Sequence, residues 1–193
     1  MKRILVLTGT PGVGKSTVSE QLASSLPGQH INVSDIVAAE QLVCGTDKAR
    51  KTQIADISRV SSRIAKITEE KEGYLIIDGH FASDLVEAKN LFMAFVLRRD
   101  PVELQSILRK RGYDTHKVSE NVACEILDIC LVDALQAYGK GKVCEIDCSN
   151  KSAATIAEEI RSILKKTGKC NVGIIDWLTK LESEGTLDSF LAS

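Results

Sequence analysis

The chain has 193 residues, of which 44% are hydrophobic and 26% are charged, an ordinary composition for a globular protein with a good core. Its 25 basic residues nearly balance its 26 acidic ones, for a net charge of −1, which argues against a protein that coats nucleic acid or a membrane surface. No apolar run approaches the length of a membrane span, and the first predicted strand begins too early for a signal peptide. We therefore expect a cytoplasmic protein without sequence-specific binding of nucleic acid.

The first predicted elements are a strand, a glycine-rich loop and a helix. Residues 4–7 form a short apolar run, typical of a strand buried in a parallel sheet. Residues 9–16 read GTPGVGKS, which fits the phosphate-binding P-loop pattern G-x-x-x-x-G-K-[ST]. Apolar residues then recur at helical spacing until Pro27-Gly28. A glycine-rich turn without a ligand could match the pattern, but the strand and helix around it favour a nucleotide site.

Each fixed position of this loop has its own physical role. Gly12 and Gly14 have no Cβ, so the backbone can bend sharply and approach phosphate groups. The N–H groups of such a loop converge on phosphate oxygens, assisted by the N-terminus of the following helix. Lys15 places a positive charge near the β- and γ-phosphates, and the Ser16 hydroxyl is the expected Mg²⁺ ligand.

Further apolar runs predict strands over residues 29–31, 74–77, 91–97 and 142–146. Helical patterns follow the later strands: one begins after Pro101, one stripe extends over residues 122–134, and another over residues 156–164. Strands that alternate with helices indicate βαβ units. We therefore predict the α/β P-loop NTPase fold, a five-stranded parallel sheet with helices on both faces.

Two segments interrupt this pattern. Residues 34–70 are predicted to be helical and poor in strands, and residues 109–120 begin with the basic stretch RKRGY. If both segments leave the carboxyl ends of strands, they lie on the same side as the P-loop. They then suit an acceptor-binding flap and a lid, although two solvated charged faces would have the same composition. The basic residues of the first segment are Lys48, Arg50, Lys51, Arg59 and Arg63.

Asp78 directly follows the buried strand at residues 74–77, which is the Walker-B arrangement. Its carboxylate could hold Mg²⁺ beside Ser16, directly or through water. His80 lies two residues further on. Its ring could orient a water or an acceptor oxygen, or could simply form a hydrogen bond to the loop.

Arginines suit the other side of a phosphoryl-transfer site, because their planar fork grips phosphate. Arg111 is the strongest lid candidate, since the adjacent Gly112 supplies a hinge. Arg98 and Arg99 follow the strand at residues 91–97. We expect at least one of them to point into the site and the other to be a surface charge.

The cysteines form no C-x-x-C pair and have no histidine at zinc-like spacing. We expect reduced, mostly buried thiols, with a structural metal as the alternative and no disulfide. The six are Cys44, Cys124, Cys130, Cys144, Cys148 and Cys170.

Several segments, in order over about residues 3–165, resemble the adenylate kinase isoenzyme 6 family of eukaryotic and archaeal nucleoside monophosphate kinases. The combination of an Arg-Gly-Tyr lid with the following Glu-Asn and Cys-Glu-Ile is specific to that family, whereas shikimate kinases and ordinary adenylate kinases share only the P-loop. The matching segments are residues 7–15, 31–35, 56, 59–60, 77–80, 96–98, 111–113, 120–122 and 124–126.

The resemblance implies phosphoryl transfer from ATP to AMP or a related monophosphate with Mg²⁺, together with intrinsic ATPase activity. It also implies a role in small ribosomal subunit maturation, with a small-subunit ribosomal protein as the partner. By matching positions, the catalytic residues are Lys15, Asp78, His80 and Arg111. ATP is expected to bind Gly12, Val13, Gly14, Lys15, Ser16, Thr17 and Arg111. The acceptor is expected to bind Asn32, Asp35 and Arg59, and Mg²⁺ to bind Ser16 and Asp78.

The sequence departs from the family at residues 36–39, IVAA, which offer no basic residue for an acceptor phosphate. Arg59 or the cluster at residues 48–51 could substitute. Two other functions therefore stay open: an ATP-driven ribosome assembly factor with incidental kinase activity, and a P-loop kinase of another small metabolite.

We divide the chain into a kinase domain at residues 1–167 and an amphipathic C-terminal extension at residues 168–193. Within the kinase domain we place the monophosphate-binding region at about residues 32–63 and the lid at about residues 109–120. The extension is expected to pack on the core, or else to present a docking surface to a partner.

Overall fold

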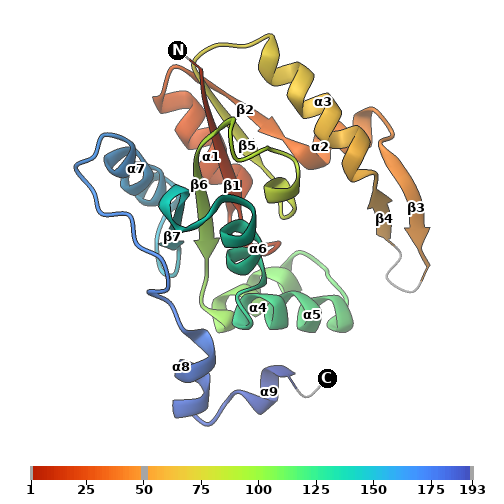
Figure 1. Cartoon of the computed structure of the whole chain (residues 1–193). Helices are drawn as coiled ribbons and strands as arrows, with labels where there is room; N and C mark the ends of the chain where they lie inside the picture. The colour runs from red at the N-terminus through yellow and green to blue at the C-terminus, as the bar shows by residue number, and fades with distance from the viewer. Residues whose placement is uncertain (1, 49–51, 192–193) are drawn as a thin grey trace.

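A computed structural model of the protein describes residues 2–48 and 52–191. Its centre is a five-stranded parallel sheet with the strand order β2-β5-β1-β6-β7 (Figure 1). The predicted fold class and all the predicted strands are thereby confirmed. The strands are β1 (Arg3–Thr8), β2 (Gly28–Asn32), β5 (Tyr74–Asp78), β6 (Leu91–Arg98) and β7 (Val143–Asp147).

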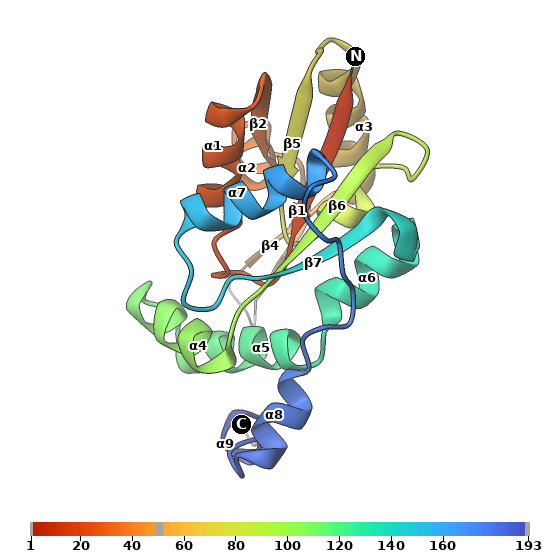
Figure 2. The ribbon, with the colours of Figure 1, turned by 90° about the vertical axis from the view of Figure 1, so that its left-hand side faces the viewer.

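Helices cover both faces of the sheet. Helices α1 (Lys15–Ser25) and α7 (Ala153–Leu164) lie on one face, and α3 (Ile57–Glu69) and α6 (Ile129–Tyr138) lie on the other (Figure 2). Side chains of β1 alternate between the two cores, because successive residues of a strand point to opposite faces. Leu5 and Leu7 belong to the core beneath α1 and α7, while Ile4 and Val6 belong to the core beneath α3 and α6.

Two further helices lie beyond the carboxyl ends of the strands (Figure 1). They are α4 (Pro101–Lys110) and α5 (Thr115–Ile126). The chain turns between them at Gly112, which has a φ of 77°. Short 3-10 turns η1 (Ala82–Asp84) and η2 (Lys140–Lys142) complete the connections around β6 and β7.

The segment that we predicted to be helical contains a β-hairpin. After α2 (Val33–Ala39), strands β3 (Val43–Asp47) and β4 (Thr52–Ala55) pair antiparallel, apart from the main sheet. The helical prediction holds for α2 and α3 but was wrong for the hairpin, because both of its strands are largely exposed and lack the apolar alternation that marks a strand. Arg50 and Lys51 lie outside the described residues.

The stripe at residues 122–134 is divided between two helices. Helix α5 ends at Ile126 and α6 begins at Ile129. Between them Asp128 has a φ of 58°, a left-handed conformation that Asp tolerates better than most residues. The Asp128 carboxylate accepts a hydrogen bond from the guanidinium of Arg98. A contact to a distant residue therefore holds the break, and no local signal predicted it.

The C-terminal segment packs against α5. It contains α8 (Trp177–Ser183) and α9 (Asp188–Leu191). Trp177 and Leu181 are buried in the same core as α1 and α7, together with Ile175 before them. None of the helices in the described ranges is long and apolar enough to cross a membrane.

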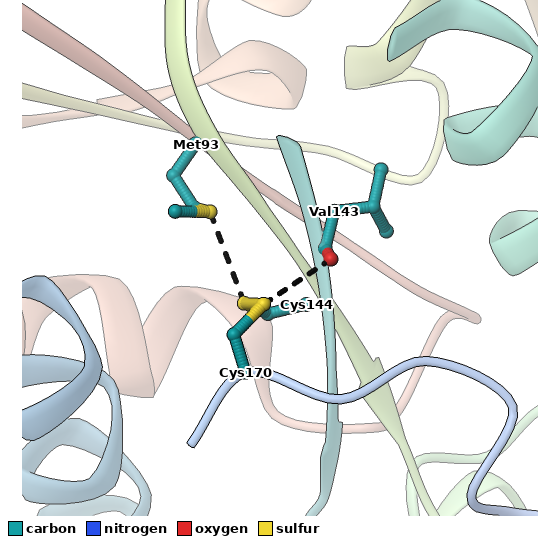
Figure 3. Close-up of a disulfide and its surroundings, with 4 residues drawn as sticks. All are labelled: Met93, Val143, Cys144 and Cys170. Atoms are coloured by element: carbon teal, nitrogen blue, oxygen red, sulfur yellow. Dashed lines mark hydrogen bonds between the residues drawn. A yellow bond between two sulfur atoms is a disulfide. The ribbon is translucent and has the colours of Figure 1, made fainter. Parts of the chain in front are cut away.

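The expectation of reduced cysteines was wrong for one pair. Cys144 and Cys170 form a disulfide, with their Cα atoms 5.2 Å apart across 26 residues (Figure 3). The pairing depends on tertiary structure: the Glu145 N–H donates to the Asn171 carbonyl at 2.8 Å, so the chain near Cys170 lies beside β7. The other cysteines are Cys44, Cys124, Cys130 and Cys148.

Candidate active site

A cavity of about 1140 Å³ opens at the carboxyl ends of β1, β2 and β5. Its walls come from the P-loop, the start of α2, the segment after β5, the lid and the facing ends of α5 and α6. All four residues predicted to be catalytic line it: Lys15, Asp78, His80 and Arg111. Gly12, Gly14, Ser16 and Thr17 also line it, whereas Val13 is fully buried beneath the loop.

The P-loop bends through glycines with positive φ, 139° at Gly9, 98° at Gly12 and 107° at Gly14. Gly9 also lies against β6, where an added Cβ would lie 2.4 Å from the Leu97 carbonyl oxygen. No other residue fits there without moving backbone. The sheet therefore fixes where the loop begins, and α1 starts directly after it with its N-terminus toward the cavity.

The Lys15 ammonium lies within this loop. It donates to the carbonyl oxygens of Gly9 at 2.7 Å and Thr10 at 3.1 Å. Desolvation lowers the pKa of Lys15, against the opposing effect of nearby Asp78, while the positive charge of Arg111 lowers it further. A phosphate between Lys15 and Arg111 would offset both the desolvation of the ammonium and its repulsion by Arg111. The loop therefore favours an anionic ligand.

Asp78, at the end of β5, is 2% exposed. Its Oδ2 accepts from Ser16 Oγ at 2.7 Å, and Ser16 Oγ also accepts from Asn32 Nδ2 at 3.2 Å. Oδ1 of Asp78 lies 2.8 Å from His30 Nε2. The hydrogen bond to Asp78 raises the pKa of His30.

The oxygen atoms of Ser16 and Asp78 are the hard donors that Mg²⁺ prefers, so this pair fits that ion. In the part of the chain that the structure describes, no three His, Cys, Asp or Glu side chains cluster as a metal site. An Mg²⁺ ion that binds together with a nucleotide typically takes only one or two protein ligands, and substrate phosphates and water supply the rest.

His80 faces the cavity. Its carbonyl oxygen, rather than its ring, contacts the strand before the P-loop, where it accepts from Thr8 Oγ1 at 3.1 Å. Desolvation by the cavity walls and the charge of Lys15 lower the pKa of His80 to about 4. The imidazole is therefore neutral near pH 7, and a neutral ring can accept a hydrogen bond from a water or an acceptor hydroxyl.

The lid lies between α4 and α5. Arg111 ends α4 and is exposed on the cavity wall. Lys117, on the first turns of α5, places its ammonium 4.6 Å from the centre of the Tyr113 ring, and both residues line the cavity. Two cations therefore face the P-loop from the lid side.

The prediction for Arg98 and Arg99 was wrong, because neither lines the cavity and neither is a surface charge. Arg98 is 1% exposed and pairs with carboxylates inside the protein. Arg99 is partly buried, donates to the Val13 carbonyl at 3.3 Å and pairs with Glu103 at 2.8 Å. Both arginines lie on the side of the P-loop that faces away from the cavity, because β6 ends beneath the loop rather than beside the cavity.

On the acceptor side, no lysine or arginine of residues 32–48 and 52–63 lines the cavity. From residues 32–48 and 52–63, only Asn32, Ser34 and Thr52 line the cavity. Asp35 is not among the lining residues, and its N–H donates to the Asn32 side chain at the start of α2. Arg59 is exposed on α3 and does not line the cavity either.

Two residues of the site, His30 and Glu125, were missed from the sequence, whereas Asn32 was predicted to bind the acceptor. His30 and Asn32 lie two apart on β2, so they share a face, and the register places Asn32 beside Asp78. That alternation was a usable signal. Glu125, whose Oε2 accepts from Thr10 Oγ1 at 2.6 Å, had none, because 115 residues separate the two partners.

Comparison with known proteins places this geometry in a family. The profile described as "AAA domain" matches residues 5–128. A Methanocaldococcus jannaschii protein named "Putative adenylate kinase" is 36% identical over 95% of this chain and 98% of its own. A Pyrococcus abyssi protein of the same name is 33% identical over 90% and 91%.

Among solved structures, a shikimate kinase from Acinetobacter baumannii, in complex with shikimate, matches with a TM-score of 0.62. The match covers 86% of this chain and 94% of that one, at 12% identity, and so shows the fold alone. The matches to the two archaeal proteins extend over nearly their whole length. The chain therefore belongs to the AAA domain family and to the adenylate-kinase-like P-loop proteins that these relatives represent.

Proposed function

We propose that the protein is a nucleoside monophosphate kinase that transfers the γ-phosphoryl group of ATP to AMP or a related monophosphate. One observation carries the proposal: Lys15, the Ser16–Asp78 pair, His80 and Arg111 converge on a single cavity from three separate parts of the chain. The names of the archaeal relatives support the same activity.

The P-loop holds the donor in this proposal. Its backbone N–H groups and the N-terminus of α1 bind the phosphates, and Lys15 adds a compact charge at the β- and γ-phosphates. Arg111 approaches from the lid and stabilises the charge that spreads over the transferring group. Closure of the lid also excludes water, which favours transfer over hydrolysis.

Ser16 and Asp78 would hold Mg²⁺, which supplies charge neutralisation at the phosphates when it is bound with ATP. Asn32 and His30 keep those two side chains oriented through the hydrogen bonds described above. His80, as a neutral imidazole, donates its ring N–H to an oxygen of the acceptor phosphate in kinase turnover. In the intrinsic ATPase activity that we also propose, its unprotonated ring nitrogen accepts a hydrogen bond from the attacking water.

The acceptor would lie between the start of α2 and the lid. Because residues 32–48 and 52–63 place no lysine or arginine on the cavity wall, we assign the acceptor phosphate to Arg111 and Lys117 of the lid. Asn32 offers it a neutral donor. The contributions of Asp35 and Arg59 stay predictions.

A coupled assay with ATP, Mg²⁺ and each of AMP, CMP, GMP, UMP or no acceptor tests the proposal. We expect ADP to accumulate fastest with AMP and slowly without acceptor, and we expect Lys15→Met to abolish both signals. Formation of ADP that no monophosphate accelerates above the acceptor-free rate would contradict the kinase assignment. Phosphate release without acceptor would identify the ATPase, and acceleration only by non-nucleotide metabolites, added as a further arm, would favour the third function.

The second candidate is an ATP-driven assembly factor that binds a ribosomal protein of the small subunit in the cytoplasm. The lack of an acceptor-side cation on the described cavity wall favours it. Binding of small-subunit ribosomal proteins to the immobilised chain, with and without ATP, tests it. An interaction that ATP weakens or strengthens supports this function. An affinity that is the same with and without ATP contradicts it.

A further inference from the structure

One buried carboxylate connects the P-loop with the C-terminal segment. Oε2 of Glu125 accepts from Thr10 Oγ1 at 2.6 Å. Oε1 accepts from Arg98 Nε at 2.8 Å, from the Arg99 N–H at 3.0 Å and from Trp177 Nε1 at 3.2 Å. Thr10 and Glu125 are each 1% exposed. Water is therefore excluded from the network and cannot replace a missing donor, so the geometry depends on every donor being present.

The same network holds the C-terminal segment at a second point. Arg98 reaches Glu145 Oε1 at 2.7 Å. Glu145 Oε2 accepts from the N–H groups of Gly173 at 2.8 Å and Ile174 at 3.0 Å. The Glu145 N–H donates to the Asn171 carbonyl. Residues 171–177 therefore contact Glu125 and Glu145, the two fully buried carboxylates that pair with Arg98.

The charge balance explains why these donors matter. Glu125 and Glu145 are buried with a single guanidinium between them, and Asp128, the third partner, is 36% exposed. Burial alone would lower the pKa of Arg98, but the three carboxylates outweigh it and raise that pKa. The two buried carboxylates carry one more negative charge than the guanidinium balances, and neutral hydrogen-bond donors must stabilise it. An uncompensated buried charge is costly. The C-terminal segment supplies three of these donors.

Thr10 transmits this arrangement to the nucleotide site. Its side chain is held by Glu125, while its carbonyl oxygen accepts from Lys15 Nζ at 3.1 Å. A shift of the Glu125 carboxylate therefore moves the loop residue that positions the P-loop ammonium. The Cys144–Cys170 disulfide fastens the segment directly before its contact with Glu145 (Figure 3).

We propose that residues 171–177 set the position of the P-loop for ATP, with Trp177 and Glu125 as positioning residues that act through Thr10. This inference rests on the proposed function only in that the P-loop binds ATP. The chemistry of transfer stays with the cavity residues. The C-terminal segment is then part of the donor site, although no atom of residues 171–177 lines the cavity.

The test is a double-mutant cycle in which the Kd for ATP is measured for each variant. Trp177→Phe removes the Nε1 donor and keeps the aromatic packing, and Thr10→Val removes the hydroxyl and keeps the shape. We expect each variant to raise the Kd for ATP about 3- to 10-fold, a range that matches the net contribution of one typical hydrogen bond. Because both substitutions act through Glu125, the Kd of the double variant for ATP should not exceed the higher Kd of the two single variants.

Leu181→Val is the matched control, because Leu181 is buried in the same segment but belongs to the apolar core. It should lower the melting temperature and leave the Kd for ATP unchanged. The KM for the acceptor monophosphate should not change in Trp177→Phe, since its effect is confined to the donor loop.

An unchanged Kd in Trp177→Phe overturns the inference, as does a double variant whose loss equals the product of the single losses. If Leu181→Val weakens ATP as much as Trp177→Phe, the role is only structural and the inference is also wrong. These outcomes are distinct from failure of the proposed function, in which the unaltered protein itself would not bind ATP.

Discussion

Replacing Arg98 by methionine removes one cation from the inside of the protein and keeps most of the apolar volume. The guanidinium donates to Glu125, Glu145 and Asp128 and to the Glu125 carbonyl at 2.9 Å. Glu125 and Glu145 are 1% and 0% exposed, so water cannot replace the lost donors. The variant therefore buries two carboxylates without their counter-ion.

The expected cost is about 3–5 kcal/mol, the range for removing one partner of a buried ion pair. That is a large part of the roughly 5–15 kcal/mol by which domains are stable.

Urea unfolding followed by circular dichroism at pH 7.5 measures this loss of stability. Arg63→Met is the control, because the Arg63–Glu40 pair is exposed by 38% and 37%, and it should cost less than about 1 kcal/mol. A loss below about 1 kcal/mol for Arg98→Met, or a loss no larger than that of Arg63→Met, would refute the reasoning.

Three further predictions follow from the lid, the C-terminal helix and the disulfide. Arg111→Met should lower kcat/KM about 100-fold in the coupled assay, as removal of one transition-state donor does, with an unchanged melting temperature because Arg111 is exposed. Burial tends to raise the pKa of Asp100, but hydrogen bonds from Lys180 and backbone N–H groups outweigh it and hold that pKa below 3.8. This ion pair therefore stabilises the fold above pH 3.8 and is lost as the pH falls through the lowered pKa. Lys180→Met should cost less than about 1 kcal/mol at pH 7 and nothing at pH 2 in urea titrations, and an equal cost at both would contradict it. Serine at both Cys144 and Cys170 should lower the free energy of unfolding by about 3–4 kcal/mol, from a closed loop of 26 residues. Dithiothreitol should reduce the stability of the unaltered protein to the same value, and no effect of the reductant would count against the bond.

The sheet and the donor side of the site could be predicted because their signals are local. A buried strand followed by glycines and Lys15 needs no distant residue to be recognised, and Asp78 directly follows its own apolar run. These strands are buried on both faces, so they keep a continuous apolar pattern. The hairpin of β3 and β4 is exposed and has no such pattern.

What could not be predicted depends on contacts between distant residues. Arg98 and Arg99 are adjacent and chemically alike, yet only the direction of β6 decides which one is buried. The break at Asp128 and the pairing of Cys144 with Cys170 likewise depend on residues 26 to 30 positions away. Such signals lie in the packed structure rather than in any short window of sequence.

The disulfide also changes how the chain behaves when it is cut. Cys144 and Cys170 enclose all of α7 in a covalent ring. A protease that cleaves once within residues 145–169 would leave its two products joined. A nicked molecule would therefore migrate as one species on a denaturing gel until a reductant is added, and the peptide beyond the cut would stay attached to the sheet.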